Sequence, residues 1–215
     1  MSTSDRKQLV QSLLEHAGTT YAEEAGIRLK DQPMPLFELL VLCMLASKPI
    51  DAAIAVSAAR ELFADGLRTP DAVLDADRQQ MIRAFGRAHY VRYDESSADR
   101  LIDIAETVRA QYRGDLRHLA AESDGDVRAA ADLLKQFKGI GDTGSDIFLR
   151  EVQDVWTWVR PYFDERATAA ARELGLPGKA GDLAELAPGS TAELAAALVR
   201  VSLDDKLREK VSSSR

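Results

Sequence analysis

The segment 137–145 is the feature that most constrains what this chain of 215 residues can fold into. It reads Phe-Lys-Gly-Ile-Gly-Asp-Thr-Gly-Ser and lies between two stretches with helical periodicity. Before it, apolar residues recur at the i, i+3, i+4, i+7 spacing of one buried helix face, and after it a similar pattern resumes. Glycine lets the connection turn tightly and lets another molecule approach its backbone. We therefore predict two helices joined by a Gly-Ile-Gly turn.

The start of the second of these helices suggests a binding function. The first N–H groups of a helix have no partner inside it, and the helix dipole is positive at that end. Phosphate and other anions bind at such ends. A Gly-x-Gly turn between helices also serves as a simple C-cap, so the turn alone leaves both interpretations open.

Composition and helix signals favour an all-α fold. Alanine is abundant and runs of β-branched residues are few, which favours helices over strands. Thr69-Pro70-Asp71 combines a cap residue, a first-turn proline and an acid, as a helix start does. The segment 37–45 is apolar on every face, which predicts a helix inside a bundle. We also expect a stop at Gly86 and a capping box at 190–193.

Several classes of protein are disfavoured by what the sequence lacks. No apolar run approaches the roughly 20 residues that span a bilayer, and the start lacks the apolar core of a signal peptide, so we expect a cytoplasmic protein. The single cysteine, Cys43, and three scattered histidines supply no metal-ligand spacing. A net charge of −7 argues against coating nucleic acid by charge alone, but it leaves room for a local basic face.

The Gly-Ile-Gly turn is followed in the sequence by Asp164 and then by Leu174-Gly175-Leu176. This order resembles the helix-hairpin-helix DNA glycosylases of the endonuclease III superfamily. In that family the hairpin reads Leu-Pro-Gly-Val/Ile-Gly, and a catalytic aspartate follows in a Val-Asp-x-x-x-x-Arg setting near Leu-Gly-Leu. The segments 35–40 and 69–72 are similar to the family's opening core helix and its Thr-Pro-Glu-Ala step. The resemblance extends through residues 35–176.

The resemblance implies a DNA base excision repair protein with two helical lobes and a cleft between them. One lobe would be a bundle over 31–155 that ends with the hairpin, and the other would combine 1–30 with 156–215. The partner would be double-stranded DNA with a damaged or abasic site, bound by a monomer that would then be nucleoid-associated. One nucleotide would be flipped into the cleft.

The resemblance also assigns roles to individual residues. Asp164 would be catalytic, with its charge stabilising the positive charge that develops on the sugar. A backbone phosphate would be bound by the hairpin residues Lys138, Gly139, Ile140, Gly141 and Gly144. Stacking on bases or filling the gap left by the flipped base would fall to Lys48, Trp156, Trp158 and Tyr162. Ordinary structural roles compete with these: a helix N-cap for Asp164, core packing for the tryptophans, and a solvated loop for Lys48.

Departures from the family narrow the expected activity. Thr143 occupies the position of the family's lyase lysine, and a hydroxyl cannot form an imine with an abasic aldehyde. No cysteine follows Leu176, so we expect no iron–sulfur cluster and no other cofactor. Asp142 places an acid beside the phosphate-binding turn. We predict a monofunctional DNA glycosylase. The alternatives are a non-catalytic protein of this fold that binds DNA structure or a protein partner, and a helical protein that resembles the family only in its turn.

Overall fold

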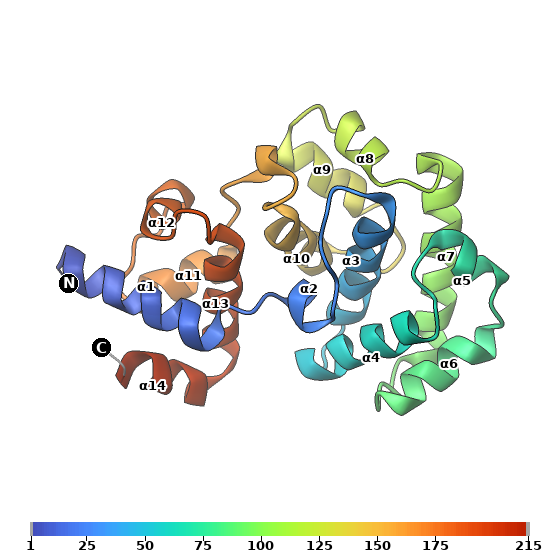
Figure 1. Cartoon of the computed structure of the whole chain (residues 1–215), viewed down its shortest axis with the longest axis horizontal. Helices are drawn as coiled ribbons and strands as arrows, with labels where there is room; N and C mark the ends of the chain where they lie inside the picture. Colours follow the sequence, from blue (N-terminus) through green and yellow to red (C-terminus); the bar gives the residue numbers. More distant parts are fainter. Residues whose placement is uncertain (1, 214–215) are drawn as a thin grey trace. The chain divides into compact units, whose positions relative to one another are not determined.

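The computed structural model describes residues 2–213, and within that range every regular element is a helix (Figure 1). This confirms the predicted all-α class. The α-helices are α1 (Thr3–Ala17), α2 (Tyr21–Glu24), α3 (Pro33–Ala46), α4 (Ala52–Ala64), α5 (Pro70–Asp75), α6 (Arg78–Arg87), α7 (Asp94–Tyr112), α8 (Arg117–Glu122), α9 (Val127–Leu134), α10 (Asp142–Val152), α11 (Glu165–Glu173), α12 (Ala180–Leu186), α13 (Thr191–Leu203) and α14 (Asp205–Ser213). A 3₁₀ turn, η1, covers Thr157–Val159.

The chain divides into two compact units. The middle unit is Ala22–Phe148, and the terminal unit combines residues 2–21 with residues 149–213. The boundaries predicted from the sequence are 30/31 and 155/156. Residues 22–30 are predicted to lie with the chain ends but belong to the middle unit, and residues 149–155 are predicted to lie in the bundle but belong to the terminal unit. Helix α10 begins in the middle unit and ends in the terminal unit.

Helix α3 is the core of the middle unit. Pro33 stands in its first turn, where the N–H that proline lacks would have had no partner. From Pro35 to Leu45 every residue is buried, as predicted for a helix that is apolar on all faces. The one charged residue in this run, Glu38, is 1% exposed and pairs with Arg68 at 2.5 Å.

Of the helix signals predicted in the middle unit, the start at Thr69 is confirmed and the stop at Gly86 is wrong. The Thr69 hydroxyl accepts the N–H of Ala72 at 3.2 Å, so the predicted helix start is confirmed. The predicted stop at Gly86 is wrong, because α6 continues to Arg87. The chain instead leaves the helix at His89, whose φ of +57° is left-handed. A single glycine in a helix costs only about 1 kcal/mol, and packing of the rest of α6 exceeds that cost.

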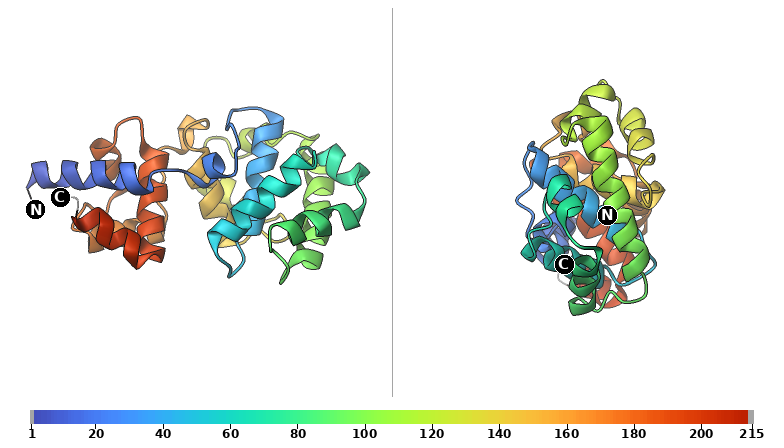
Figure 2. Two further views of the ribbon diagram at one scale, coloured as in Figure 1. Left: turned by 60° about the horizontal axis from the view of Figure 1, so that its bottom comes forward. Right: turned by 90° about the vertical axis from the view of Figure 1, so that its right-hand side faces the viewer.

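The terminal unit brings the two ends of the chain together. Helix α1 lies against α13 and α14 (Figure 2), and the Ser12 hydroxyl donates to the carbonyl of Val211 at 3.1 Å. The core is built from small and branched apolar residues of these helices and α11, among them Leu9, Leu13, Ala167, Ala171, Leu194 and Leu198. The expected capping box at the start of α13 is wrong, since the Ser190 side chain makes no capping hydrogen bond.

Candidate functional site

The turn that joins α9 to α10 is closed by its own backbone and its apolar residues. The N–H of Ile140 donates to the carbonyl of Phe137 at 3.0 Å, and both side chains are buried. Gly139 has a φ of +95°, a left-handed conformation that favours glycine. Helix α10 then begins at Asp142, so the connection predicted between the two helices has the local geometry of a tight turn.

The three hairpin glycines have different surroundings. A Cβ atom on Gly139 would lie 2.8 Å from Cδ of Arg100, and one on Gly144 would lie 2.6 Å from Oγ of Ser47. These two glycines therefore make room for other parts of the same unit. A Cβ atom on Gly141 would meet no atom of the described part of the chain within 4 Å. Among the three, Gly141 is the position at which an outside molecule could approach the backbone.

The cations at the turn are partnered by acids. Lys138 lies 2.8 Å from Asp103, and Lys135 lies 3.0 Å from Asp132 and 3.4 Å from Asp142. Hydrogen bonds to Asp132 and Asp142 raise the pKa of Lys135. Asp142 is 91% exposed in the first turn of α10, where its charge stabilises the helix dipole. A DNA phosphate that bound here would have to compete with these three carboxylates.

Lys48 lies beside an aromatic residue that the sequence did not single out. Its ammonium is 5.9 Å from the ring centroid of Tyr93, and the guanidinium of Arg92 is 5.3 Å from the same centroid. Both distances are within the range of a cation–π interaction. Because Ser47 touches Gly144, this cluster adjoins the start of α10. No periodicity connects these segments, so only the fold reveals the cluster.

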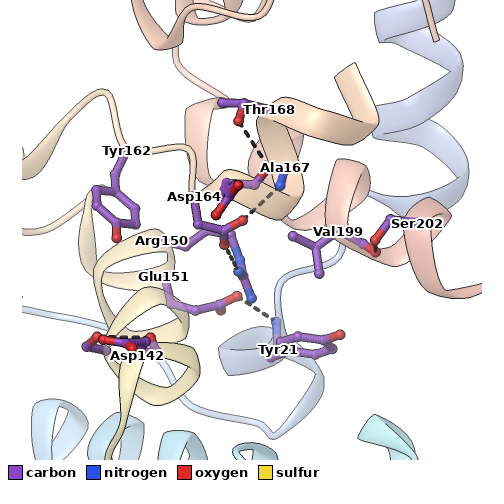
Figure 3. A network of polar contacts seen from close by, with 12 residues as sticks. Tyr21, Asp142, Arg150, Glu151, Tyr162, Asp164, Ala167, Thr168, Val199 and Ser202 are labelled. Atoms are coloured by element: carbon purple, nitrogen blue, oxygen red, sulfur yellow. Dashed lines mark hydrogen bonds and ion pairs between the residues drawn. The ribbon is translucent and has the colours of Figure 1, made fainter. Parts of the chain in front are cut away.

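Asp164 caps α11 and forms a buried ion pair (Figure 3). Its Oδ1 atom accepts the N–H of Ala167 at 2.8 Å, which confirms the N-cap interpretation. Its Oδ2 atom accepts a hydrogen bond from Nη1 of Arg150, and the two side chains are 4% and 3% exposed. Both carboxylate oxygens therefore have a donor within the terminal unit.

Arg150 is surrounded by groups that keep it charged. Burial works against the charged form, but the charges of Asp164 and Glu151 raise its pKa above the ordinary value. Glu151 accepts the N–H of Tyr21 at 3.2 Å, and the Tyr21 ring lies 5.9 Å from the Arg150 guanidinium. Among the described residues, Nε and Nη2 of Arg150 are buried without a hydrogen-bond partner, and the guanidinium donates to Asp164. Nothing in the sequence singles out Arg150, because a basic residue near a helix C-terminus is ordinarily expected to interact with the helix dipole at the surface.

Gln153 anchors the segment that leads to Asp164. Its side-chain nitrogen donates to the carbonyls of Arg150 and Tyr162, each at 3.0 Å, and its oxygen accepts the N–H of Tyr162 at 2.9 Å. The residue is fully buried. This amide therefore attaches the backbone two residues before Asp164 to the end of α10.

The two tryptophans stack on one another. Their ring centroids are 5.6 Å apart and their planes differ by 17°. Trp156 is 3% exposed, as in core packing, whereas Trp158 is half-buried and Tyr162 is also partly exposed. In this arrangement Trp158 has more open surface than Trp156.

Thr143 and Cys43 lie in different surroundings. Thr143 is exposed in the first turn of α10, and Cys43 is buried in α3. Over residues 2–213, no group of three or more His, Cys, Asp or Glu side chains is arranged to hold a metal ion. In the same range no helix combines the length and apolar character needed to cross a bilayer.

Comparison with known proteins finds likeness among solved structures. No protein-family model matches the chain, and no curated protein does either. Among solved structures, the chain is similar to one described as a trapped endonuclease III–DNA covalent intermediate, in an estranged-adenine complex. The identity is 15%, the match covers 94% of this chain and 86% of that chain, and the TM-score is 0.49.

Proposed function

We propose that this chain is a monofunctional DNA glycosylase of base excision repair. It would hydrolyse the N-glycosidic bond of a flipped base in double-stranded DNA and leave the abasic strand intact. The observation that carries the proposal is the Asp164 carboxylate, which two donors hold at the start of α11 in the chain order expected after the Gly-Ile-Gly turn. In this proposal the chain acts as a monomer in the cytoplasm, in association with the nucleoid.

The turn would bind the DNA backbone. The N–H groups at the start of α10 lack partners within the helix, as at any helix N-terminus. Gly141 is open to solvent on the side where a Cβ atom would stand, so a phosphate could reach these groups. Lys138 is exposed and could exchange Asp103 for a phosphate. Lys48, Arg92 and Tyr93 would add cations and a stacking surface beside the turn.

Asp164 would supply the charge for catalysis. The sugar gains positive charge as the glycosidic bond breaks, and a carboxylate fixed beforehand stabilises that charge without reorganising. Ala167, Arg150 and the Gln153 anchor restrict the movement of Asp164. Removal of one such electrostatic group typically costs about 10²–10³-fold in rate.

The chemistry would stop at the abasic site. Thr143 offers a hydroxyl where the lyase enzymes have an amine, and imine formation requires an amine. The sequence contains one cysteine, Cys43, so the four-cysteine iron–sulfur site of the family cannot be built within it. The proposed reaction uses water and no cofactor.

The test uses duplexes that each carry one modified base: uracil, thymine glycol, 8-oxoguanine or an alkylated adenine. Wild type and Asp164→Asn are incubated with each duplex, and the products are split into samples with and without alkali. We expect breaks that need alkali and that disappear in Asp164→Asn. Breaks without alkali would refute the assignment of Thr143, and absence of breaks in every duplex would refute the glycosylase.

The burial of Asp164 favours one alternative. Its side chain is 4% exposed and both oxygens are already engaged, as expected of a purely structural N-cap. The chain would then bind DNA structure or a protein partner without catalysis. In that case Asp164→Asn would lower stability but leave binding to an abasic-site duplex unchanged, and no duplex would lose its base.

A further inference from the structure

The Arg150–Asp164 pair bears on which bases the proposed glycosylase could remove. A carboxylate that stabilises a cationic sugar works through its negative charge. Here a guanidinium of opposite sign is in direct contact with that carboxylate, and both side chains are buried (Figure 3). The field of the pair is that of a dipole, which decreases faster with distance than the field of a single charge. The stabilisation left for the sugar is therefore smaller than an unpaired aspartate would provide.

Within residues 2–213, the groups that contact Asp164 also include no general acid that could protonate a leaving base. A neutral base leaves as an anion unless an acid protonates it, and such assistance is worth about 10²–10⁴-fold. The groups that donate to Asp164 are the backbone N–H of Ala167 and the guanidinium of Arg150. The surrounding carboxylates raise the pKa of that guanidinium, so it holds its protons. Neither donor acts as a general acid.

We propose that Arg150 is a specificity-determining residue that restricts excision to bases which already carry a positive charge, namely purines alkylated on a ring nitrogen. This inference rests on the proposed glycosylase function. Such a base needs neither a strong negative field nor a proton in order to leave. The bond from C1′ to the ring nitrogen breaks, and its electron pair cancels the charge of the base. The oxygen of water then bonds to C1′, and the surplus proton goes to solvent.

The experiment measures release of free base by chromatography, with enzyme in excess over sites. One substrate is duplex DNA methylated with dimethyl sulfate, which carries cationic 7-methylguanine and 3-methyladenine. The others are duplexes with uracil or hypoxanthine, which are neutral. We expect wild type to release the methylated purines at least about 10²-fold faster than the blank, and the neutral bases at the blank rate. Asp164→Asn should reduce the first rate to the blank.

Two variants test the role of Arg150 itself. Arg150→Lys keeps the cation and should keep the preference, although the overall rate falls because the planar donor is lost. Arg150→Gln removes the cation, so the ratio of cationic to neutral release should fall by about tenfold or more. Far-ultraviolet circular dichroism checks that each variant is folded. If Arg150→Gln does not fold, the inference is tested by the ratio of methylated-purine release to neutral-base release in wild type and in Arg150→Lys.

Each outcome has a separate meaning. Equal release of neutral and methylated bases by wild type would overturn this inference and leave the glycosylase proposal intact. An unchanged ratio in folded Arg150→Gln, or loss of the preference in Arg150→Lys, would also overturn it. Failure of wild type to release any base would refute the proposed function and this inference together.

Discussion

The hydroxyl of Ser47 lies against Gly144, too close to leave room for a side chain there. A Cβ atom on Gly144 would come within 2.6 Å of Oγ of Ser47, and that hydroxyl is held in place because it donates to the carbonyl of Cys43 at 2.6 Å. The end of α3 and the first turn of α10 therefore pack at a distance that only glycine permits. This contact brings Lys48 beside the turn proposed to bind DNA.

Gly144→Ala should lower the free energy of unfolding by about 1–3 kcal/mol, because overpacking forces one of the two elements to move. Urea denaturation measures the change. Ser47→Ala/Gly144→Ala should recover part of the loss, since the oxygen is removed. Gly181→Ala is the control: its Cβ atom would meet nothing within 4 Å, and the variant should be as stable as wild type or up to about 1 kcal/mol more stable. A double variant no better than the sum of its single variants would show that this contact is not the cause.

Gly139→Ala should be destabilising for two reasons. The φ of +95° is unfavourable for alanine, and the new methyl group would lie 2.8 Å from Cδ of Arg100. We expect a loss of about 1–3 kcal/mol. Gly86→Ala, in an open position of α6, should instead gain about 0.5–1 kcal/mol. Thermal or urea unfolding compares the two, and a Gly139→Ala protein as stable as wild type would contradict the assigned backbone strain.

Gln153→Leu should affect both stability and the proposed activity. It removes the donors and acceptor that attach the backbone of Tyr162 to α10, and each polar group left buried and unpaired costs about 1–3 kcal/mol. Asp164 lies two residues after Tyr162, so a looser backbone there would also displace the proposed catalytic carboxylate and slow base release. Gln153→Glu keeps the acceptor for the Tyr162 N–H and should be less damaging to stability. Unchanged unfolding in Gln153→Leu would show that the anchor is dispensable.

Glu38 predicts a pH dependence of stability. Burial raises the pKa of its carboxyl above the ordinary 4.5, and the contact with Arg68 only partly opposes that rise. The folded protein therefore binds this proton more tightly than the unfolded chain. As the pH falls from neutral through the raised folded value towards 4.5, the folded state takes up the proton first and this group's contribution to the free energy of unfolding increases.

Glu38→Gln provides the matched control for that pH dependence, because it cannot titrate. Wild type and variant are unfolded with urea at a series of pH values from 7 down to 4.5. The difference, wild type minus variant, should increase as the pH falls. A difference that stays constant or decreases would contradict the assignment.

Local signals in the sequence predicted much of the helical framework. Thr69 caps its helix as expected, and the apolar run 37–45 forms the buried part of α3. These features depend on neighbours within a few residues, so a linear pattern contains them. Two local predictions were wrong: the helix end at Gly86 and the capping box that begins at Ser190. Each rests on a preference of about 1 kcal/mol. Packing of α6 outweighs the first, and the backbone angles at the start of α13 outweigh the second.

For the candidate site, the sequence by itself determined the turn, the chain position of Asp164 and the absence of a lysine at position 143. Only the tertiary structure decided that Asp164 is paired with Arg150, that Ser47 contacts Gly144 and that Lys48 lies against Tyr93. These partners are separated by tens of residues or by an irregular connection, and no helical period links them. Helix caps and turns depend on local backbone geometry, whereas the surroundings of a buried charge depend on which helices pack against it.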